Sequence, residues 1–500
     1  MTQTVAQRVE LALVALALAA AVAAGLHDLG RPWDGDLRGM IVSMDTHRFV
    51  HNHLELGLAK TRGGGVTFVD PLNGAPYFYG NHPATTPLLL LPFAALFGDR
   101  EDTLRVAATL LWLPAVLALW RLARRWLAPP APGAAALLLA TLSVNVVWGP
   151  CPHLELVVLP ALLLAALAFV RQLERPGPGR ALALGLAVVF SGLTDWPGLF
   201  VVPLLLGLAA AWPERRRALL LALRVAPLPL VSLALIHIHT VAFHRRQDIG
   251  LQYWLALFGA THGFVVDLKT FMATHLAYLL DGLGPLVLAL ATLGAVLSLR
   301  AGAAGRRRVV AAGALMIPGL LNVLLFRHHA VIHPFWGMFG TAGVALLAAA
   351  PCTGALGAEA GGARAGGRRL GLLAAGAALA LVLVAAGLGL RSGFAAMDAW
   401  RGNELHELGR LLDERFERGD VVASPVELAA ADIYVRATLI SPVATPEALD
   451  ALERRYAPPA FTGRLGFVVP EREGDGALAR ALRVTSEPQP CGRWLLFELR

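Results

Sequence analysis

Lysine is almost missing from this chain: Lys60 and Lys269 are the only lysines among 43 basic residues, so arginine supplies the net charge of +8. Charged residues of both signs make up only 16% of the sequence, against 56% hydrophobic residues and a mean hydropathy of +0.60. A soluble protein of 500 residues does not have this balance. The arginines occur in short runs between apolar segments, which indicates membrane topology and gives no reason to expect a nucleic acid partner.

Cysteine is also scarce. Its three residues, Cys151, Cys352 and Cys491, are too widely spaced to form a metal-ligand motif or a disulfide framework. No segment repeats at a fixed period, and inverted halves of the transporter kind are not evident. The preference for arginine, with abundant alanine and glycine, is typical of a GC-rich genome, so we expect a bacterial source. These features describe a polytopic membrane protein without a covalent framework.

Runs of arginine divide the apolar sequence and predict which helix ends face the cytoplasm. Five runs are expected on that side: 121–125, 171–180, 215–217, 300–308 and 364–369. Between them the sequence predicts apolar helices at 104–124, 133–149, 155–171, 180–194, 197–212, 217–239, 276–299, 309–326, 334–350 and 369–390. A first helix is expected at 11–26. Arg8 and Glu10 precede it, and because their charges nearly cancel, the segment lacks the basic start of a signal peptide and a retained helix is favoured over a cleaved one. We therefore expect about 11 spans.

One apolar segment, 87–97, has about half of the roughly 20 residues that a spanning helix needs. If it crossed the bilayer, every later arginine run would change sides, so we interpret it as a re-entrant or interfacial helix. After residue 390 the charge density becomes that of a soluble protein, and helix-like stretches alternate with β-rich runs. The predicted domains are a transmembrane domain at 1–390, with an outer loop at 27–86, and a soluble domain at 391–500. The predicted fold class is an all-α polytopic membrane bundle with a small C-terminal α/β extracytoplasmic domain.

A polar segment at 45–87 lies between apolar stretches and concentrates ionisable side chains at the membrane surface. Asp45 opens it, just before an amphipathic stretch at 52–58. A carboxylate held there can act as general base towards an incoming hydroxyl. The alternative role for Asp45 is a helix N-cap. Asp34 and Asp36 compete for the role of base, but they lie in a loop with less helical support.

Later polar residues fall on the same predicted outer side. Ionisable groups at helix ends in a membrane protein are costly unless they face a cavity or a partner, so their convergence predicts a site, although any single one can simply snorkel to the headgroups. Glu155 and Asp195 are candidates to orient sugar hydroxyls, or to hold a divalent cation with His82 and His153. Candidate metal ligands are therefore His82, His153 and Glu155, and no cofactor is required by any motif. Trp196 offers a face for a sugar ring or belongs to an interfacial aromatic belt.

A lipid phosphate would need cations on this side. The planar fork of arginine matches phosphate oxygens in two-point contact. Candidates for this role are Arg245, Arg246 and Arg327, with His328 beside the last and His333 a few residues further on. The alternative for each is a solvated loop at the surface.

The order of these features resembles the GT-C superfamily of membrane glycosyltransferases, in particular bacterial proteins similar to protein O-mannosyltransferases and aminoarabinose transferases. The resemblance is carried by a short first helix, an acidic residue before N-H-L-x-x-G-L, and Y-F-Y-G-N-H-P before an apolar P-L-L run. TDWPG and HPFW look like later motifs of the same group. Many relatives have two adjacent acidic residues where this chain has Asp45-Thr46, and the common H-H-P-P is Asn81-His82-Pro83-Ala84 here.

The resemblance implies an enzyme that transfers a sugar from a polyprenyl-phosphate-linked donor to an acceptor hydroxyl on the outer face, with inversion and with Asp45 as base. The acceptor would be a lipid, a glycan or a protein of the cell envelope. The protein would be a multi-pass component of the inner (cytoplasmic) membrane, with its active site and C-terminal domain facing the periplasm or the cell exterior. The alternatives are a lipid-linked sugar transporter or flippase, and a catalytically silent GT-C-like lipid-binding protein.

Substitution of Arg327 tests the phosphate assignment. We expect Arg327→Ala to weaken binding of a polyprenyl-phosphate donor by roughly tenfold, because a charge-assisted hydrogen bond is lost. Donor affinity of the purified protein in detergent measures the effect, with Arg300→Ala on the predicted cytoplasmic side as the control. Unchanged affinity in Arg327→Ala would remove this residue from the phosphate site.

Overall fold

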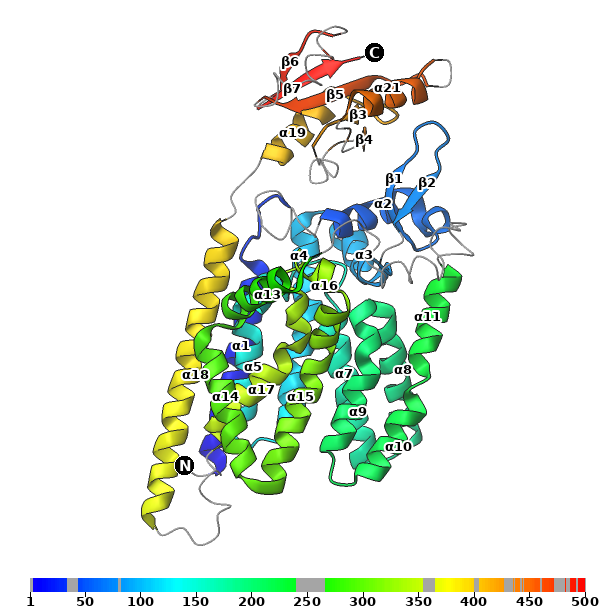
Figure 1. The fold of residues 1–500 in the computed structure, drawn as a ribbon. Helices are drawn as coiled ribbons and strands as arrows, with labels where there is room; N and C mark the ends of the chain where they lie inside the picture. The colour runs from blue at the N-terminus through cyan, green and yellow to red at the C-terminus, as the bar shows by residue number, and fades with distance from the viewer. Residues whose placement is uncertain are drawn as a thin grey trace. The chain divides into compact units, whose positions relative to one another are not determined.

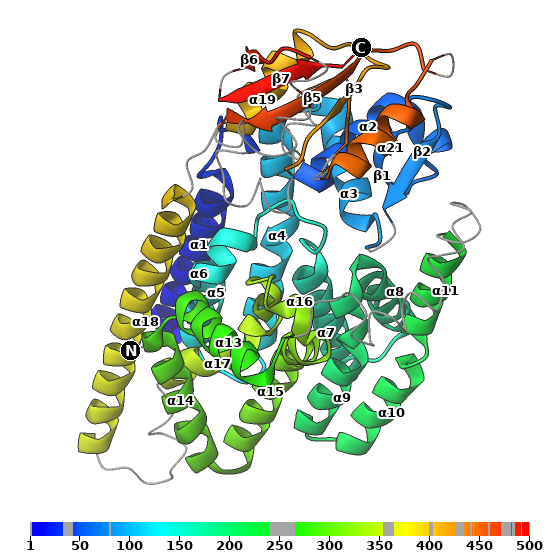
Figure 2. The ribbon, with the colours of Figure 1, turned by 45° about the horizontal axis from the view of Figure 1, so that its top comes forward.

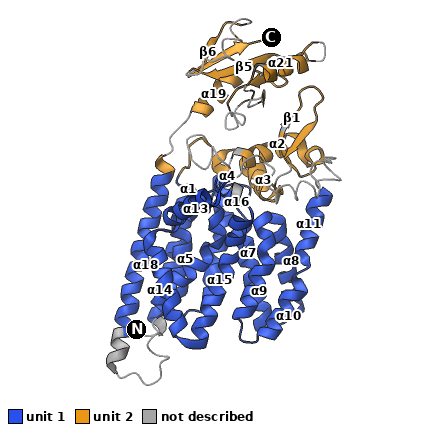
Figure 3. Ribbon diagram, viewed as in Figure 1, with its two compact units in different colours: residues 1–27, 105–396 blue, residues 28–104, 397–500 orange. Residues whose placement is uncertain are grey.

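The computed structural model divides into two compact units. Its described residues are 3–33, 44–79, 82–239, 266–353, 365–399, 404–426, 435, 437–440, 443, 445–458, 461–471, 482, 486–491 and 493–499. Residues 1–27 and 105–396 form unit 1, and residues 28–104 with 397–500 form unit 2 (Figure 3).

Unit 1 is a bundle of apolar helices (Figure 1). Its described helices in chain order are α1 (Gln3–Leu26), most of α4 (Glu101–Ala123), α5 (Ala131–Thr141), α6 (Ser143–Trp148), α7 (Val158–Glu174), α8 (Pro178–Thr194), η3 (Trp196–Phe200), α9 (Val201–Ala211), α10 (Arg215–Val225), α11 (Leu228–Ile238), α13 (Leu268–Leu283), α14 (Pro285–Arg300), α15 (Gly302–Leu325), α16 (Arg327–Ala330), η5 (Trp336–Gly340), α17 (Thr341–Ala349), η6 (Ala350–Cys352) and most of α18 (Ala365–Ala399). The prediction of a helical membrane bundle is therefore confirmed.

Within the described residues, five helices are long and apolar enough to cross a membrane: Val5–Leu26, Glu101–Ala123, Arg215–Ile238, Gly302–Leu325 and Gly371–Ala399. The bent pair of α13 and α14 would make a sixth. Five further apolar helices are shorter: Thr85–Phe97, Ala131–Thr141, Pro178–Thr194, Trp196–Ala211 and Trp336–Cys352. The count of about 11 spans stays a prediction.

The single helix predicted at 276–299 is instead two helices that meet at an angle of 89°. Gly284, with φ +78°, ends α13, and its N–H donates to the carbonyl of Leu280 at 3.0 Å. Pro285 then begins α14, where its missing N–H costs no helical hydrogen bond. A glycine after one helix and a proline at the start of the next are the usual signals for such a break.

Small residues and one buried amide hold the bundle together. Gly294 of α14 lies so close to α17 that a Cβ there would be 1.9 Å from the carbonyl oxygen of Leu347. Asn145, which is buried in α6, donates to the Leu139 carbonyl at 2.7 Å and to Thr341 Oγ1 of α17 at 3.1 Å. Contacts between small residues and hydrogen bonds between helices are the main attractive forces where lipid removes the hydrophobic difference.

Glu10 is a charged residue inside the apolar first helix, and it is buried. Its Oε1 accepts a hydrogen bond from Trp120 Nε1 at 2.6 Å and lies 3.3 Å from Arg124 Nε. Glu10 therefore links α1 to the C-terminal end of α4, where it pairs with Arg124.

Unit 2 begins with elements that precede most of the bundle in sequence. They are α2 (Met44–Thr61), the antiparallel strands β1 (Gly65–Val69) and β2 (Pro76–Tyr79), and α3 (Thr85–Phe97). The apolar helix expected at 87–97 is α3, which has 13 residues. Glu101 and Asp102, in the first turn of α4, accept hydrogen bonds from the backbone of Trp33 and Gly30.

The C-terminal part of unit 2 contains a five-stranded sheet in the order β4-β3-β5-β7-β6 (Figure 2). Its elements are α19 (Glu404–Asp413), β3 (Val421–Ala423), β4 (Thr438–Ile440), α21 (Pro446–Arg455), β5 (Leu465–Pro470), β6 (Gln489–Cys491) and β7 (Trp494–Glu498). Strand β3 is parallel to β4 and β5, and the other pairs are antiparallel. Successive residues of β5 point to opposite faces of the sheet and join two different hydrophobic cores. Phe467 belongs to the same core as Leu452 of α21, and Val468 belongs to the same core as Leu412 of α19.

Gly294 tests the close approach of α14 and α17. We expect Gly294→Ala to lower the thermal stability of the detergent-solubilised protein, by about 1–3 kcal/mol, because the added methyl group forces the two backbones apart. Gly313→Ala is the matched control, since a Cβ at Gly313 of α15 meets nothing within 4 Å. Equal melting temperatures for the two variants would contradict the contact.

Candidate functional site

The predicted base lies at the start of α2. The helix begins at Met44, so Asp45 lies in its first turn, where the helix dipole favours a carboxylate. The Asp45 side chain is 37% exposed, and its Oδ1 lies 4.0 Å from Arg48 Nη1. The competing candidates Asp34 and Asp36 lie outside the described residues. Asp45 is therefore partly exposed, and among the described residues its ion pair with Arg48 is a long one.

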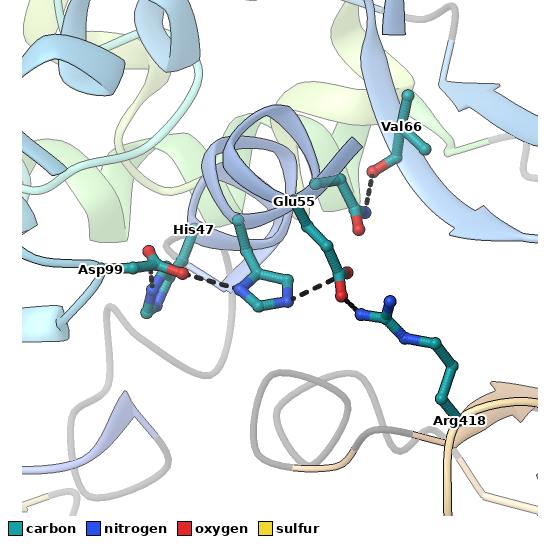
Figure 4. A network of polar contacts seen from close by, with 7 residues as sticks. His47, Glu55, Val66, Asp99 and Arg418 are labelled. Carbon is teal, nitrogen blue, oxygen red and sulfur yellow. Dashed lines mark hydrogen bonds and ion pairs between the residues drawn. The ribbon is translucent and has the colours of Figure 1, made fainter. Parts of the chain in front are cut away.

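The next turn of α2 is fixed by a buried chain of hydrogen bonds. Trp33 Nε1 donates to His47 Nδ1 at 2.7 Å. On its other side, His47 Nε2 lies 3.0 Å from Asp99 Oδ1 (Figure 4). Because an indole nitrogen can only donate, His47 Nδ1 must be the accepting nitrogen. His47 is then the neutral tautomer, and its Nε2–H donates to Asp99.

Asp99 also binds the turn of α2 that follows His47. His51, four residues beyond His47 on the same face of α2, places Nδ1 2.6 Å from Asp99 Oδ2. Its Nε2 lies 3.5 Å from Glu55, which in turn pairs with Arg418 (Figure 4). His51 therefore lies between two carboxylates, those of Asp99 and Glu55.

The charge of Asp99 is stabilised by these contacts. Burial alone raises the pKa of Asp99, but the hydrogen bonds from His47 and His51 outweigh that effect and hold the pKa well below its usual range. Asp99 follows α3 directly and precedes α4. One ionised carboxylate therefore connects two turns of α2 to the junction of α3 and α4.

The opposite face of α2 is anchored by neutral groups. Asn52 Nδ2 donates to the Val66 carbonyl of β1 at 2.7 Å. Thr61 Oγ1 donates its only proton to the Gly57 carbonyl, so it accepts from His53 Nδ1 at 2.7 Å. Burial lowers the pKa of His53 to about 4, which keeps this imidazole neutral at physiological pH.

Unit 1 contributes a second group of predicted residues. Glu155 is buried, and its Oε2 lies 3.1 Å from His153 Nδ1. His153 Nε2 donates to the Trp148 carbonyl at 3.1 Å, so both of its ring nitrogens have protein partners. Asp195 is buried too, and its Oδ1 accepts from the backbone N–H of Trp196 at 2.6 Å at the start of η3.

Glu155 and Asp195 meet although 40 positions separate them in the sequence. A carboxylate oxygen of one lies within 4.8 Å of a carboxylate oxygen of the other. Two like charges at this separation repel each other, so a shared proton or a cation would stabilise the pair. Oxygen ligands of this kind suit a hard divalent cation.

The remaining predicted residues are distributed over both units. His82 belongs to unit 2, where its ring lies parallel to Tyr79 with centroids 6.0 Å apart. Arg327 begins α16 of unit 1 and is exposed. His333 stacks on Trp336 at 4.7 Å. Arg245, Arg246 and the side chain of His328 lie outside the described residues.

The acid of this network is not among the residues predicted from the sequence. Neither Asp99 nor the pair His47 and His51 belongs to a recognised motif. Their spacing of four residues was visible in the sequence and places both rings on one helical face. The reversal of the chain after the short helix α3 brings Asp99 to that face.

Known proteins share the fold. Residues 81–244 match the sequence model of a family described as dolichyl-phosphate-mannose-protein mannosyltransferase. The chain aligns with ArnT from Cupriavidus metallidurans bound to undecaprenyl phosphate over 98% of both chains, with a TM-score of 0.64 and 14% identity. The predicted resemblance is confirmed. The apo form of the same ArnT gives a TM-score of 0.65 at 15% identity, over 97% of this chain and 98% of ArnT.

A second similar structure is the oligosaccharyltransferase AglB from Archaeoglobus fulgidus, in complex with an inhibitory peptide and a dolichol-phosphate. The alignment covers 97% of this chain and 74% of AglB, with a TM-score of 0.53 and 14% identity. The comparison with curated proteins found no match. At these identities the likeness establishes the fold alone.

The neutral state of His53 gives a prediction for pH dependence. The pKa of His53 is about 4 in the folded protein and about 6.5 when unfolded, so the unfolded chain binds more protons between these values. We expect stability to fall as pH drops from about 6.5 to about 4, and His53→Asn, which can still donate to Thr61, to reduce that fall. Melting temperatures across this pH range measure the effect. A fall that is unchanged in His53→Asn but lost in the control His51→Gln would contradict it.

Proposed function

We propose that the chain is an integral membrane glycosyltransferase that moves a sugar from a polyprenyl-phosphate-linked donor to an acceptor hydroxyl on the outer face of the membrane. The observation that carries the proposal is the fold shared with ArnT over 98% of both chains, because that ArnT structure holds a polyprenyl phosphate. The match of residues 81–244 to a mannosyltransferase family supports the same reaction class.

In the proposed reaction Asp45 acts as the base. It takes the proton of the acceptor hydroxyl as that oxygen forms a bond to the anomeric carbon, on the side opposite the phosphate. The bond from the anomeric carbon to the phosphate oxygen breaks, so the configuration is inverted. The phosphate leaves without being protonated, and Arg327 stabilises its developing charge. The transition state has oxocarbenium character, which a nearby carboxylate also stabilises.

The contacts of α2 support this role for Asp45. Asp99 binds His47 and His51 on one face, while Asn52 and His53 are bonded on the other. A helix held from two sides keeps its first turn in a defined position, which general base catalysis requires.

A divalent cation is a further part of the proposal. The neighbouring oxygens of Glu155 and Asp195 fit a hard cation, and His82 is the imidazole expected beside them from the sequence. When bound, such a cation would supply positive charge for sugar or phosphate oxygens. Trp196 then offers an apolar face to the sugar ring.

We also propose the finer topology. About 11 spans, with α3 as a re-entrant or interfacial helix, place the arginine runs in the cytoplasm of a bacterial cell and the proposed site and C-terminal domain outside it. The acceptor would then be a lipid, a glycan or a protein of the cell envelope. Arginine at one end of the helices and acidic and imidazole groups at the other support this orientation.

Turnover of a lipid-linked sugar tests the function and the base together. The full chain in detergent is incubated with sugars linked to radiolabelled undecaprenyl phosphate and with solubilised bacterial cell envelope as the source of acceptor hydroxyls, and released undecaprenyl phosphate is measured by chromatography. We expect Asp45→Asn to lower the rate at least about a hundredfold, the scale of general base catalysis, without loss of lipid binding. Asp70→Asn, a carboxylate elsewhere in unit 2, is the control.

Three outcomes would contradict the proposal in different ways. Full activity of Asp45→Asn removes that residue as base. Lipid binding by the wild-type protein without turnover of any donor indicates a silent lipid-binding protein. Movement of an intact lipid-linked sugar across vesicle membranes indicates a flippase.

A further inference from the structure

A cavity at the arginine-rich end of unit 1 has no place in the proposed reaction. It has a volume of about 560 Å³ and lies between the end of α7 and the start of α10. Its lining includes Arg215, Arg216, Arg217 and Arg224, with a single acidic residue, Glu214. Basic residues at helix ends are expected from topology alone, but their arrangement around one cavity is not.

The charges around this cavity are unbalanced. Arg217 pairs with Glu214 at 2.9 Å and also donates to the Leu173 carbonyl of α7 at 2.9 Å, so it is fixed to the cavity wall. The nearby carboxylate of Glu174 pairs with Arg125 at 2.9 Å. The structure therefore provides no carboxylate partner, within its described residues, for the other three arginines, Arg215, Arg216 and Arg224. Three guanidinium groups around one space favour an anionic occupant.

The apolar part of the cavity indicates which kind of anion fits. Leu220 and Leu221 line it together with Arg217 and Arg224, at the spacings that share one helical face. Only 17% of the most apolar 18-residue stretch of the span Arg215–Ile238 is buried inside the structure. This is the lowest buried share among the five candidate spans. Figure 1 and Figure 2 both show α10 and α11 at the edge of unit 1. The cavity therefore borders a surface that faces lipid.

We propose that this cavity binds the headgroup of an anionic glycerophospholipid. The lipid phosphate would contact Arg215, Arg216 and Arg224, and its acyl chains would lie along the exposed leucines of α10. Basic pockets between membrane helices on the cytoplasmic side bind such headgroups. An acyl chain gives the lipid an advantage over free phosphate, because part of the ligand is held on apolar surface. This site is independent of the proposed sugar transfer.

Binding of labelled lipid to the full chain tests the site. Fluorescent phosphatidylglycerol and phosphatidylcholine are titrated against the protein in a neutral detergent. The cavity variant carries Arg215→Gln, Arg216→Gln and Arg224→Gln. The matched control carries Arg300→Gln, Arg306→Gln and Arg307→Gln, which removes the same charge at the start of α15 and the end of α14.

We expect the wild-type protein to prefer phosphatidylglycerol over phosphatidylcholine. The cavity variant should bind phosphatidylglycerol about fivefold more weakly for each arginine removed, and the control should differ from wild type by less than about twofold. Equal weakening in both variants would mean that the general positive charge binds the lipid, which overturns the proposal. Displacement of the lipid by equimolar inorganic phosphate would instead indicate a site for a free anion.

If the triple variant fails to fold, Arg224→Gln provides the same test in a milder form. Arg224 lies in the last turn of α10, away from the Arg217 contacts that fix the helix. Its melting temperature without lipid reports folding, and its selectivity for phosphatidylglycerol reports the site. Unchanged selectivity in a folded Arg224→Gln protein removes Arg224 from the proposed contact.

Discussion

The arrangement around the proposed base depends on one ionised carboxylate. One carboxylate oxygen of Asp99 is hydrogen-bonded to His47 and the other to His51. These bonds connect two turns of α2 to the loop between α3 and α4. Loss of that carboxylate would leave the Nε2–H of a buried imidazole without its partner, and an unsatisfied buried donor costs about 1–3 kcal/mol. The position of Asp45, two residues before His47, follows from this contact and from Trp33 behind it.

Much of unit 1 was predictable because apolar length and arginine runs are direct physical signals. The helix expected at 309–326 is found as α15, and the one at 180–194 as α8. The break at Gly284 and Pro285 was missed, although both residues are visible in the sequence. Continuous hydrophobicity on either side of a break predicts one long helix, and only the backbone angle of Gly284 shows the turn.

The candidate site was predictable only in part. Asp45 could be chosen because an acidic residue before an amphipathic stretch is a local pattern, and Glu155 and Asp195 because each carboxylate interrupts an apolar run. Asp99 could not be chosen in this way, since its importance comes from two imidazoles about 50 residues earlier in the chain. Histidine roles were equally hidden. His47 and His53 look alike in the sequence, yet one donates to a carboxylate and the other to a threonine hydroxyl.

The right-angled break between α13 and α14 has a consequence for the surrounding bilayer. Without α13, α14 has 16 residues and is about 24 Å long, whereas the hydrocarbon core of a typical bilayer is about 30 Å thick. Other helices of unit 1 are nearly as short, including α7 and α8 with 17 residues each. Where these short helices meet lipid, the bilayer must thin locally or their terminal arginines must extend to the headgroups, whereas the five longer helices are long enough to span it. Membrane thickness is therefore a variable to which this fold is sensitive.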